Sequence, residues 1–362
     1  MPNLSNWMAS RRKLIKRVSL VSGAAVLTPI LHSLGRQTFS ASSTSPQTPA
    51  AFAESTPIAA AGLSPHRVVL VNTADRAEGV RRAIALLNPP SFSGKKVFIK
   101  PNYNTGDLAP ASTDPVVLET LVQAVQADGA SQISVGDRSG MATTRTAMEQ
   151  QKVFSLAEQY SFTPIVFDEL GRDDWQYFPS DGTNWSRGFA IARPVLNADA
   201  IINACCLKTH RFGGHFTLSL KNAVGMVARK VPGDAHDYMR ELHSSASQRL
   251  MIAEVNQAYR PALIIIDGVE AFVNGGPEQG DRVNANVMLA STDRIAIDAV
   301  GIAILRMLGT TPEVSAGSIW SQAQIRRAAD LGLGAASADQ VELVTDDEAS
   351  AEMAQKLKPF LT

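Results

Sequence analysis

The sequence predicts an α/β protein in which a mainly parallel sheet is flanked by helices. From residue 66 onwards, short runs of β-branched residues alternate with amphipathic segments of helical length, a pattern typical of successive βαβ units. Of the 362 residues, 45% are hydrophobic and 19% are charged, which is usual for a globular chain with a sizeable core. The length leaves open one large α/β domain or two smaller ones.

The positions of the strands and helices follow from this alternation. Strands are expected at 67–71, 96–100, 132–135, 164–167, 200–203, 262–266, 286–290 and 341–344. Helices are expected at 75–87, 115–128, 143–160, 246–259, 294–308, 317–331 and 348–358. Asp114 and Pro115 predict an N-cap followed by proline in the first helical turn. A soft boundary near 195–205 leaves open a division of the domain 66–362 into two Rossmann-like lobes, 66–200 and 201–362.

The N-terminal region 1–36 has the pattern of an export signal. A basic segment, 8–16, precedes an apolar run, 19–31, that is shorter than the roughly 20 residues of a transmembrane helix. Residues 10–16, Ser-Arg-Arg-Lys-Leu-Ile-Lys, resemble the twin-arginine motif. We therefore expect the twin-arginine translocase to export this protein to the periplasm or a comparable compartment. An uncleaved membrane-anchored terminus and a basic disordered arm are the alternatives.

Residues 37–65 are expected to form a disordered linker that contains the cleavage site. The segment is rich in Ser, Thr, Ala and Pro, a composition that cannot bury enough apolar surface to fold. Ala51-Phe52-Ala53 offers a small-x-small cleavage site, and 59–61 offers a second one. Cleavage at either site would leave no stable membrane anchor.

Charge and cysteine content exclude several classes of function. Residues 1–62 contain six of the 34 basic side chains and one of the 34 acidic ones, so the other 300 residues have 28 basic and 33 acidic groups. Such a body has no general attraction to nucleic acid or to anionic membranes. Two cysteines are too few for a disulfide scaffold or for an iron–sulfur cluster held by this chain alone.

Polar side chains follow four of the expected strands, where ligands bind in parallel α/β sheets. They are Lys100 and Asn102 after the second strand, Asp137 after the third, the segment 205–210 after the fifth and Asp267 after the sixth. Each could be a turn residue. Together, however, they predict one shared crevice.

The segment 208–225 is the densest in residues that carry chemistry. His210 and His215 flank two glycines, which would let the backbone bend and bring both rings to a divalent transition metal or to a substrate as acid–base groups. A third metal ligand would be Asp267, Asp137 or a cysteine. Lys208 and Lys221, in apolar surroundings, would bind an anion. For these lysines the alternative to anion binding is a salt bridge. Two further histidines, His236 and His243, could equally cap loops or helix ends.

The order of these motifs resembles the DUF362 family, an uncharacterised family. The resemblance covers roughly residues 66–335 and rests on Ile99–Asn102, Thr113–Pro115, Gly129–Ala130, Val135–Asp137, Leu207–His210, Thr217–Asn222 with Gly225, Asp267–Gly268, Gly276–Pro277 and 290–298. The resemblance implies an architecture and a candidate site, but it does not indicate a reaction. Many members have a ferredoxin-like cysteine cluster, which this chain lacks. The lysine–histidine arrangement is also similar, more distantly, to the nickel-pincer lactate racemase group of two-lobed α/β enzymes.

The sequence therefore predicts an exported protein with a Lys/His/Asp crevice, an enzyme that acts on or through a small anionic ligand, with or without a metal. The expected catalytic residues are Lys208, His210, His215 and Asp267, with His210 and His215 also the expected metal ligands. The expected ligand-binding residues are Lys100, Asn102, Asp137, Lys221 and Asn222. The alternative is a non-catalytic periplasmic protein that binds a ligand or helps to assemble a cofactor.

Overall fold

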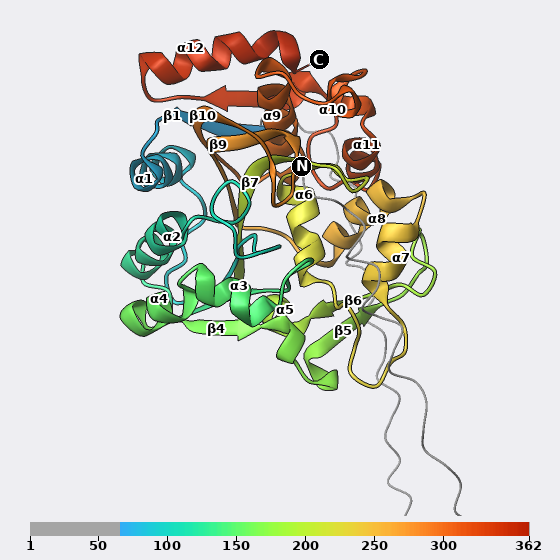
Figure 1. Cartoon of the computed structure of the whole chain (residues 1–362). Helices are drawn as coiled ribbons and strands as arrows, with labels where there is room; N and C mark the ends of the chain where they lie inside the picture. Colours follow the sequence, from blue (N-terminus) through green and yellow to red (C-terminus); the bar gives the residue numbers. More distant parts are fainter. Residues whose placement is uncertain (1–65, 362) are drawn as a thin grey trace, which may run out of the picture. The chain divides into compact units, whose positions relative to one another are not determined.

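A nine-stranded sheet runs through residues 66–361, the part of the chain that the computed structural model describes (Figure 1). The strands lie in the order β11-β1-β10-β9-β7-β2-β3-β4, and β8 pairs with β7. Five of the eight strand pairings are parallel, and those of β10 with β1 and β9 and of β8 with β7 are antiparallel. The predicted α/β class, with a mainly parallel sheet flanked by helices, is confirmed.

The strands match most of the expected positions. They are β1 His66–Asn72, β2 Lys96–Lys100, β3 Gln132–Asp137, β4 Thr163–Val166, β5 Trp175–Phe178, β6 Phe189–Ala192, β7 Ala200–His210, β8 His215–Thr217, β9 Leu263–Gly275, β10 Gly280–Ser291 and β11 Val341–Val344. Strands β5 and β6 form a separate two-stranded sheet. The β5–β6 pair and β8 were not expected from the sequence.

The seven expected helices are present, one of them divided into two, and residues 66–361 also contain four short helices that were not expected. They are α1 Arg76–Leu87, α2 Pro115–Ala127, α3 Thr144–Gln150, α4 Val153–Tyr160, α5 Arg193–Leu196, α6 Ser219–Asn222, α7 Tyr238–Ser244, α8 Gln248–Val255, α9 Arg294–Met307, α10 Pro312–Ser315, α11 Ala323–Asp330 and α12 Glu348–Leu357. The expected helix 143–160 is split into α3 and α4, because Lys152 adopts a left-handed conformation with φ of 58°. Asp114 caps α2 by accepting a hydrogen bond from Val116 N, as predicted.

Strands β7, β9 and β10 are longer than the apolar runs that predicted them. The expected strand 200–203 continues to His210, and all eleven residues of β7 are buried. The expected strand 262–266 continues to Gly275, so Asp267 lies within β9 and not in a loop after it. The expectation that polar residues mark strand ends is therefore wrong for these two strands.

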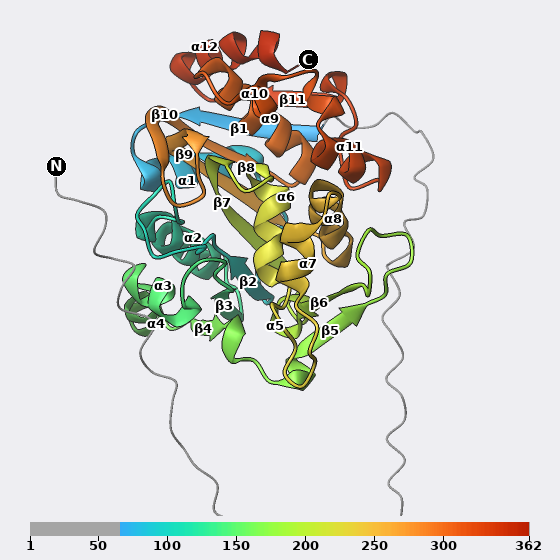
Figure 2. The ribbon, with the colours of Figure 1, turned by 45° about the vertical axis from the view of Figure 1, so that its right-hand side comes forward.

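Side chains alternate between the two faces of the sheet, as the pleat requires. Val69 and Val71 of β1 pack with α1, α2 and α4, whereas Val68 and Leu70 pack with residues of α9. A third apolar cluster, around Phe98 and Trp185, joins β2 and β7 to β5, β6, α7 and α8. Figures 1 and 2 show α1, α2 and α4 on one side of the sheet and α6 and α8 on the other.

The first described strand, β1, lies between two strands that come from the other end of the chain. It pairs antiparallel with β10 and parallel with β11. Segments 66–200 and 201–362 thus contribute strands to one sheet, and their division into lobes stays a prediction. The expected signal region 1–36 and linker 37–65 lie outside the described residues. Within 66–361, no helix is long and apolar enough to cross a membrane.

Candidate functional site

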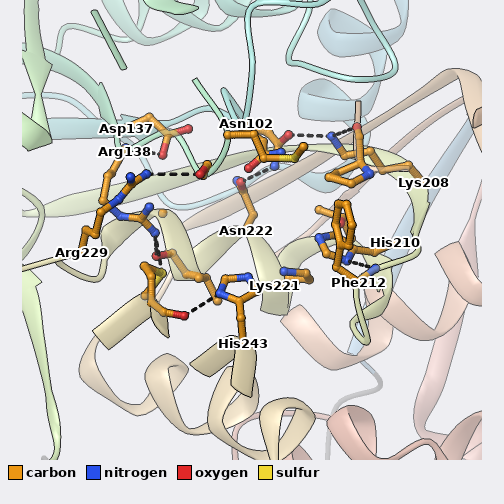
Figure 3. Close-up of a pocket in the computed structure, with 18 of the residues that line it drawn as sticks. Asn102, Asp137, Arg138, Lys208, His210, Phe212, Lys221, Asn222, Arg229 and His243 are labelled. Carbon is orange, nitrogen blue, oxygen red and sulfur yellow. Dashed lines mark hydrogen bonds between the residues drawn. The ribbon is translucent and has the colours of Figure 1, made fainter. Parts of the chain in front are cut away.

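A cavity of about 320 Å³ opens on the α6 side of the sheet, between the ends of β2, β3 and β7 and helices α6 and α7 (Figure 3). Seven of the nine residues expected at the site line it, namely Lys100, Asn102, Asp137, Lys208, His210, Lys221 and Asn222. Arg138, Phe212, Arg229, Asp237, Met239, Arg240 and His243 are among the other lining residues. The structure thus brings together residues from across the region 100–277.

Lys100 and Asp137 form a buried ion pair in the wall of the cavity. The Lys100 Nζ lies 2.7 Å from Asp137 Oδ1 and donates a hydrogen bond of 2.6 Å to the carbonyl of Pro101. The other Asp137 oxygen accepts a hydrogen bond of 2.7 Å from the backbone N–H of Tyr103. Burial lowers the pKa of Lys100, which the carboxylate of Asp137 partly offsets. This lysine is therefore held by the protein itself.

The ammonium group of Lys208 also has all its hydrogen-bond partners within the protein. It is completely buried and donates hydrogen bonds to Asn102 Oδ1 at 2.8 Å, to the carbonyl of Pro277 at 3.1 Å and to the carbonyl of Ala111. An ammonium group has three hydrogens, so these acceptors use all of them. Asn102 Nδ2 in turn donates to Asn222 Oδ1 at 2.9 Å. Lys208 could bind a ligand only by giving up one of these acceptors.

Lys221 differs from the other two buried lysines. It is 8% exposed, and among residues 66–361 its ammonium group has no hydrogen-bond or ion-pair partner. Burial, with a smaller contribution from the charge of Lys208, lowers the pKa of Lys221 to about 8. The backbone around it is fixed, because Asp298 accepts hydrogen bonds from the N–H groups of Ser219 and Leu220 at 2.7 and 3.0 Å. Lys221 thus presents an unpaired ammonium to the cavity.

His210 and His243 lie on either side of Lys221 in the cavity (Figure 3). Burial and the nearby charge of Lys221 lower the pKa of both imidazoles, that of His210 well below its usual value. Both rings therefore lose their proton more readily than a free histidine does. Phe212, 46% exposed at the cavity, packs edge-on against His210 with ring centroids 5.8 Å apart. The site thus offers two imidazoles beside one unpaired amine.

Sequence reasoning missed the basic side chains at the other side of the cavity. Arg138 is 4% exposed and donates to the carbonyls of Val227 at 2.8 Å and Val224 at 3.1 Å. Arg229 and Arg240 are exposed where they line the cavity. In all, six lysine and arginine side chains and two carboxylates line it. No spacing in the sequence links Arg138 to Arg229, because the elements from α3 to η3 (Ala223–Met226) separate them.

His215 and Asp267, two expected catalytic residues, do not line the cavity. His215 pairs with His210 across the β7–β8 hairpin, but its Nε2 lies 3.2 Å from Arg249 Nη1. Asp267 is buried and accepts a hydrogen bond of 2.7 Å from Arg76 Nε. The expectation that both rings, His210 and His215, converge on one point is corrected by this placement.

The donors expected for a metal ion are likewise not brought together. Among residues 66–361, no group of three or more His, Cys, Asp or Glu side chains has an arrangement that could hold a metal. Cys205 and Cys206 are buried within β7, and burial raises the pKa of both thiols. Asp137 is engaged by Lys100. The residues present therefore do not fit the metal site expected from the sequence.

The fold and the cavity define an α/β protein with a cavity whose charged side chains are mostly basic. Residues 97–303 match the family described as "Domain of unknown function (DUF362)". The match covers more than half of the chain and includes every residue that lines the cavity. The protein belongs to the DUF362 family.

Two further similarities concern named proteins. The chain is 29% identical over 217 residues to "Thylakoid-associated protein sll1697" of Synechocystis sp., an alignment that covers 59% of this chain and 64% of that relative. The chain therefore spans less than two thirds of this relative. Among solved structures, the lactate racemase apoprotein from Thermoanaerobacterium thermosaccharolyticum aligns with a TM-score of 0.38 and 14% identity, over 80% of this chain and 85% of that one.

Proposed function

We propose that the cavity binds a small oxyanion, a carboxylate or a phosphate, and that the protein is an enzyme that transfers a proton at the bound ligand. The observation that carries this proposal is the state of Lys221. Of the three buried lysines in the cavity, two have their acceptors within the protein and Lys221 does not. The side chain of Lys221 is mostly buried while its unpaired ammonium faces the cavity, so a bound anion would supply the counter-charge that the protein does not.

The electrostatics and size of the cavity support an anionic small molecule. Six basic side chains face two carboxylates, and one of these, Asp137, is already paired with Lys100. A volume of about 320 Å³ is at the lower end of the range for small-molecule sites, roughly 300–1,000 Å³. Two imidazoles, those of His210 and His243, line the cavity beside Lys221, and an imidazole can accept or donate a proton in catalysis.

Binding can be tested with inorganic phosphate and acetate as probes, by calorimetry and by NMR on the full chain. Lys221→Met keeps the alkyl packing and removes the charge, so we expect affinity to fall at least about tenfold, as for loss of one charge-assisted hydrogen bond. Lys356→Met is the matched control, since Lys356 is exposed on α12, outside the cavity. Equal affinity in Lys221→Met and wild type, or no binding of either anion, contradicts the proposal.

The proton transfer can be tested separately in D₂O. The protein is incubated with a panel of small carboxylates and phosphate esters that have a carbon-bound hydrogen beside the anionic or carbonyl group. Deuterium incorporation, followed by NMR, is expected for at least one compound and is expected to be lost in Lys221→Met. Saturable binding without exchange in any compound would reject the enzymatic part and leave an anion-binding protein.

We further propose that the twin-arginine translocase exports the protein to the periplasm or a comparable compartment. The support is the resemblance of segment 10–16 to the twin-arginine motif, in which Arg11 and Arg12 are the arginine pair. Replacing both arginines by lysine preserves the charge and removes the signal. We expect the variant to stay in the cytoplasm when fractions are blotted, and its normal export would contradict this proposal.

A further inference from the structure

We propose that His243 is the general base of this cavity and that its unprotonated Nε2 accepts the proton released by the bound ligand. The inference rests on the proposed function and adds the residue that performs the transfer. His243 lies in the last turn of α7 and lines the cavity. From the sequence alone, a structural role for His243 as a cap of a loop or helix end was at least as well supported as a functional role.

The hydrogen bond of His243 determines which of its nitrogens can act as a base. Its Nδ1 lies 2.7 Å from the backbone carbonyl of Met239. A carbonyl oxygen can only accept, so Nδ1 must carry the hydrogen and the neutral ring has its lone pair on Nε2. Among residues 66–361, Nε2 has no hydrogen-bond partner. Figure 3 shows a hydrogen bond on one side of the His243 ring and Lys221 on the other.

His210 is fixed in the opposite tautomer. The backbone N–H of Phe212 donates to His210 Nδ1 at 3.3 Å, so in the neutral ring the hydrogen resides on Nε2. His210 can therefore donate a hydrogen bond to an anionic ligand, and His243 can accept a proton from it. The two imidazoles beside Lys221 thus have complementary roles, which neither ring could exchange without losing its backbone hydrogen bond.

The charges around His243 favour its unprotonated form. The groups that face it are Lys221 of α6, Arg138 after β3 and Arg229 after η3, with His210 of β7 across the cavity. Burial and then Lys221 lower the pKa of His243, and the hydrogen bond to Met239 opposes them in part. As the pH falls, the His243 ring therefore stays unprotonated to a lower pH than a free histidine does.

The proton transfer is balanced within the site. A hydrogen bound to carbon or oxygen of the ligand leaves as a proton, its electron pair stays on the ligand, and a new N–H bond forms at His243 Nε2. The imidazolium keeps its Nδ1–H bond to Met239. The extra negative charge on the ligand is stabilised by the Lys221 ammonium and the Nε2–H of His210. The reverse transfer restores the neutral ring, so no further reactant is required.

Tautomers can be read directly by NMR of the full chain labelled with ¹⁵N at histidine. At pH 7.5 we expect the Nδ1–H form for His243 and the Nε2–H form for His210. Diethyl pyrocarbonate, which acylates unprotonated imidazole nitrogen, is expected to modify His243, with inorganic phosphate slowing the reaction. In Lys221→Met, removal of the neighbouring charge should raise the pH midpoint of His243 modification by about one unit.

Variants separate this inference from the proposed function. His243→Asn keeps an N–H donor near Met239 O and removes the base, so we expect phosphate binding to persist and deuterium exchange to be lost. His236→Asn is the control, because His236 bonds Glu241 outside the cavity. An Nε2–H tautomer for His243, or full exchange in His243→Asn, overturns the inference even if phosphate binds. Reactive His243 without protection by phosphate would instead contradict the proposed function.

Discussion

The ammonium of Lys100 lies 2.7 Å from the carboxylate of Asp137, and the two side chains are 1% and 3% exposed. Two backbone N–H groups, of Tyr103 and Arg138, also donate to this carboxylate, each at 2.7 Å. The pair therefore joins the end of β2 to the end of β3 in the wall of the cavity. It orders the cavity without filling it, because its charges are directed at each other.

Asp137→Asn should destabilise the protein strongly. It leaves the buried ammonium of Lys100 without its counter-charge, and breaking a buried pair from one side costs about 3–5 kcal/mol. Urea unfolding monitored by circular dichroism measures the loss. Glu169→Gln, which breaks the solvent-screened pair with Arg145, should cost far less. Similar losses in the two variants would show that the Lys100–Asp137 pair has no special structural role.

Lys208 and Lys221 should respond differently to replacement by methionine. Lys208→Met leaves three buried oxygens without their donor, at about 1–3 kcal/mol for each oxygen that finds no other partner. Lys221→Met removes an unpaired buried charge, so the free energy of unfolding in the absence of ligand should stay equal or rise. The two variants are compared by urea unfolding at pH 7. If the free energy of unfolding fell more in Lys221→Met than in Lys208→Met, Lys221 and not Lys208 would be the lysine with a structural role.

The pair His66–Asp293 should make stability depend on pH. His66 Nδ1 lies 2.6 Å from Asp293 Oδ2, and this hydrogen bond raises the pKa of His66 in the folded state. The folded protein therefore holds this proton more tightly, and the added stability is fully present below the unfolded pKa of about 6.5. It is lost as the pH rises through the folded-state pKa. Thermal unfolding of His66→Gln should show a smaller decrease in stability between pH 6 and 8 than wild type. An unchanged decrease would show that the pH dependence arises from other groups.

Gly225→Ala should disrupt the cavity wall. A Cβ at this position would lie 2.3 Å from Asp137 Oδ1 and 2.7 Å from Lys100 Nζ, well inside contact distance. Both groups are buried and bonded, so neither can move without breaking the ion pair. We expect a lower free energy of unfolding and weaker phosphate binding. Gly171→Ala, whose nearest atom would be Asp174 Oδ2 at 3.3 Å, is the matched control and should behave nearly as wild type.

Much of the fold could be predicted from hydrophobic periodicity. The apolar runs of β2 and β11 matched the observed strands at both ends, because polar or turn residues bound them. The lengths of β7 and β9 could not be predicted in this way. Lys208 is polar, yet it lies inside a strand, since Asn102, Ala111 and Pro277 supply buried acceptors from distant segments. Only the folded chain shows that such partners exist.

The candidate site could be predicted in part for a similar reason. Residues at or just beyond the ends of strands, such as Asp137 and Asn102, could be placed by the topology of parallel sheets. Asp267 was expected at such an end, but it lies within β9, where Arg76, from a distant part of the sequence, donates a hydrogen bond to it. His243 lies on a helix with no motif around it. Its position beside Lys221 depends on how α7 packs, which periodicity alone does not specify.

The position of β1 also determines when the protein can complete its sheet during synthesis. The hydroxyl of Ser291 in β10 donates to the carbonyl of Arg67 in β1, across 224 residues, and β11 comes still later. While the ribosome is translating the middle of the gene, residues 68–71, all buried in the finished protein, have neither neighbour. A nascent chain of this kind exposes an apolar strand without its neighbours for most of its elongation, and such a strand is prone to wrong pairing until the last segments emerge.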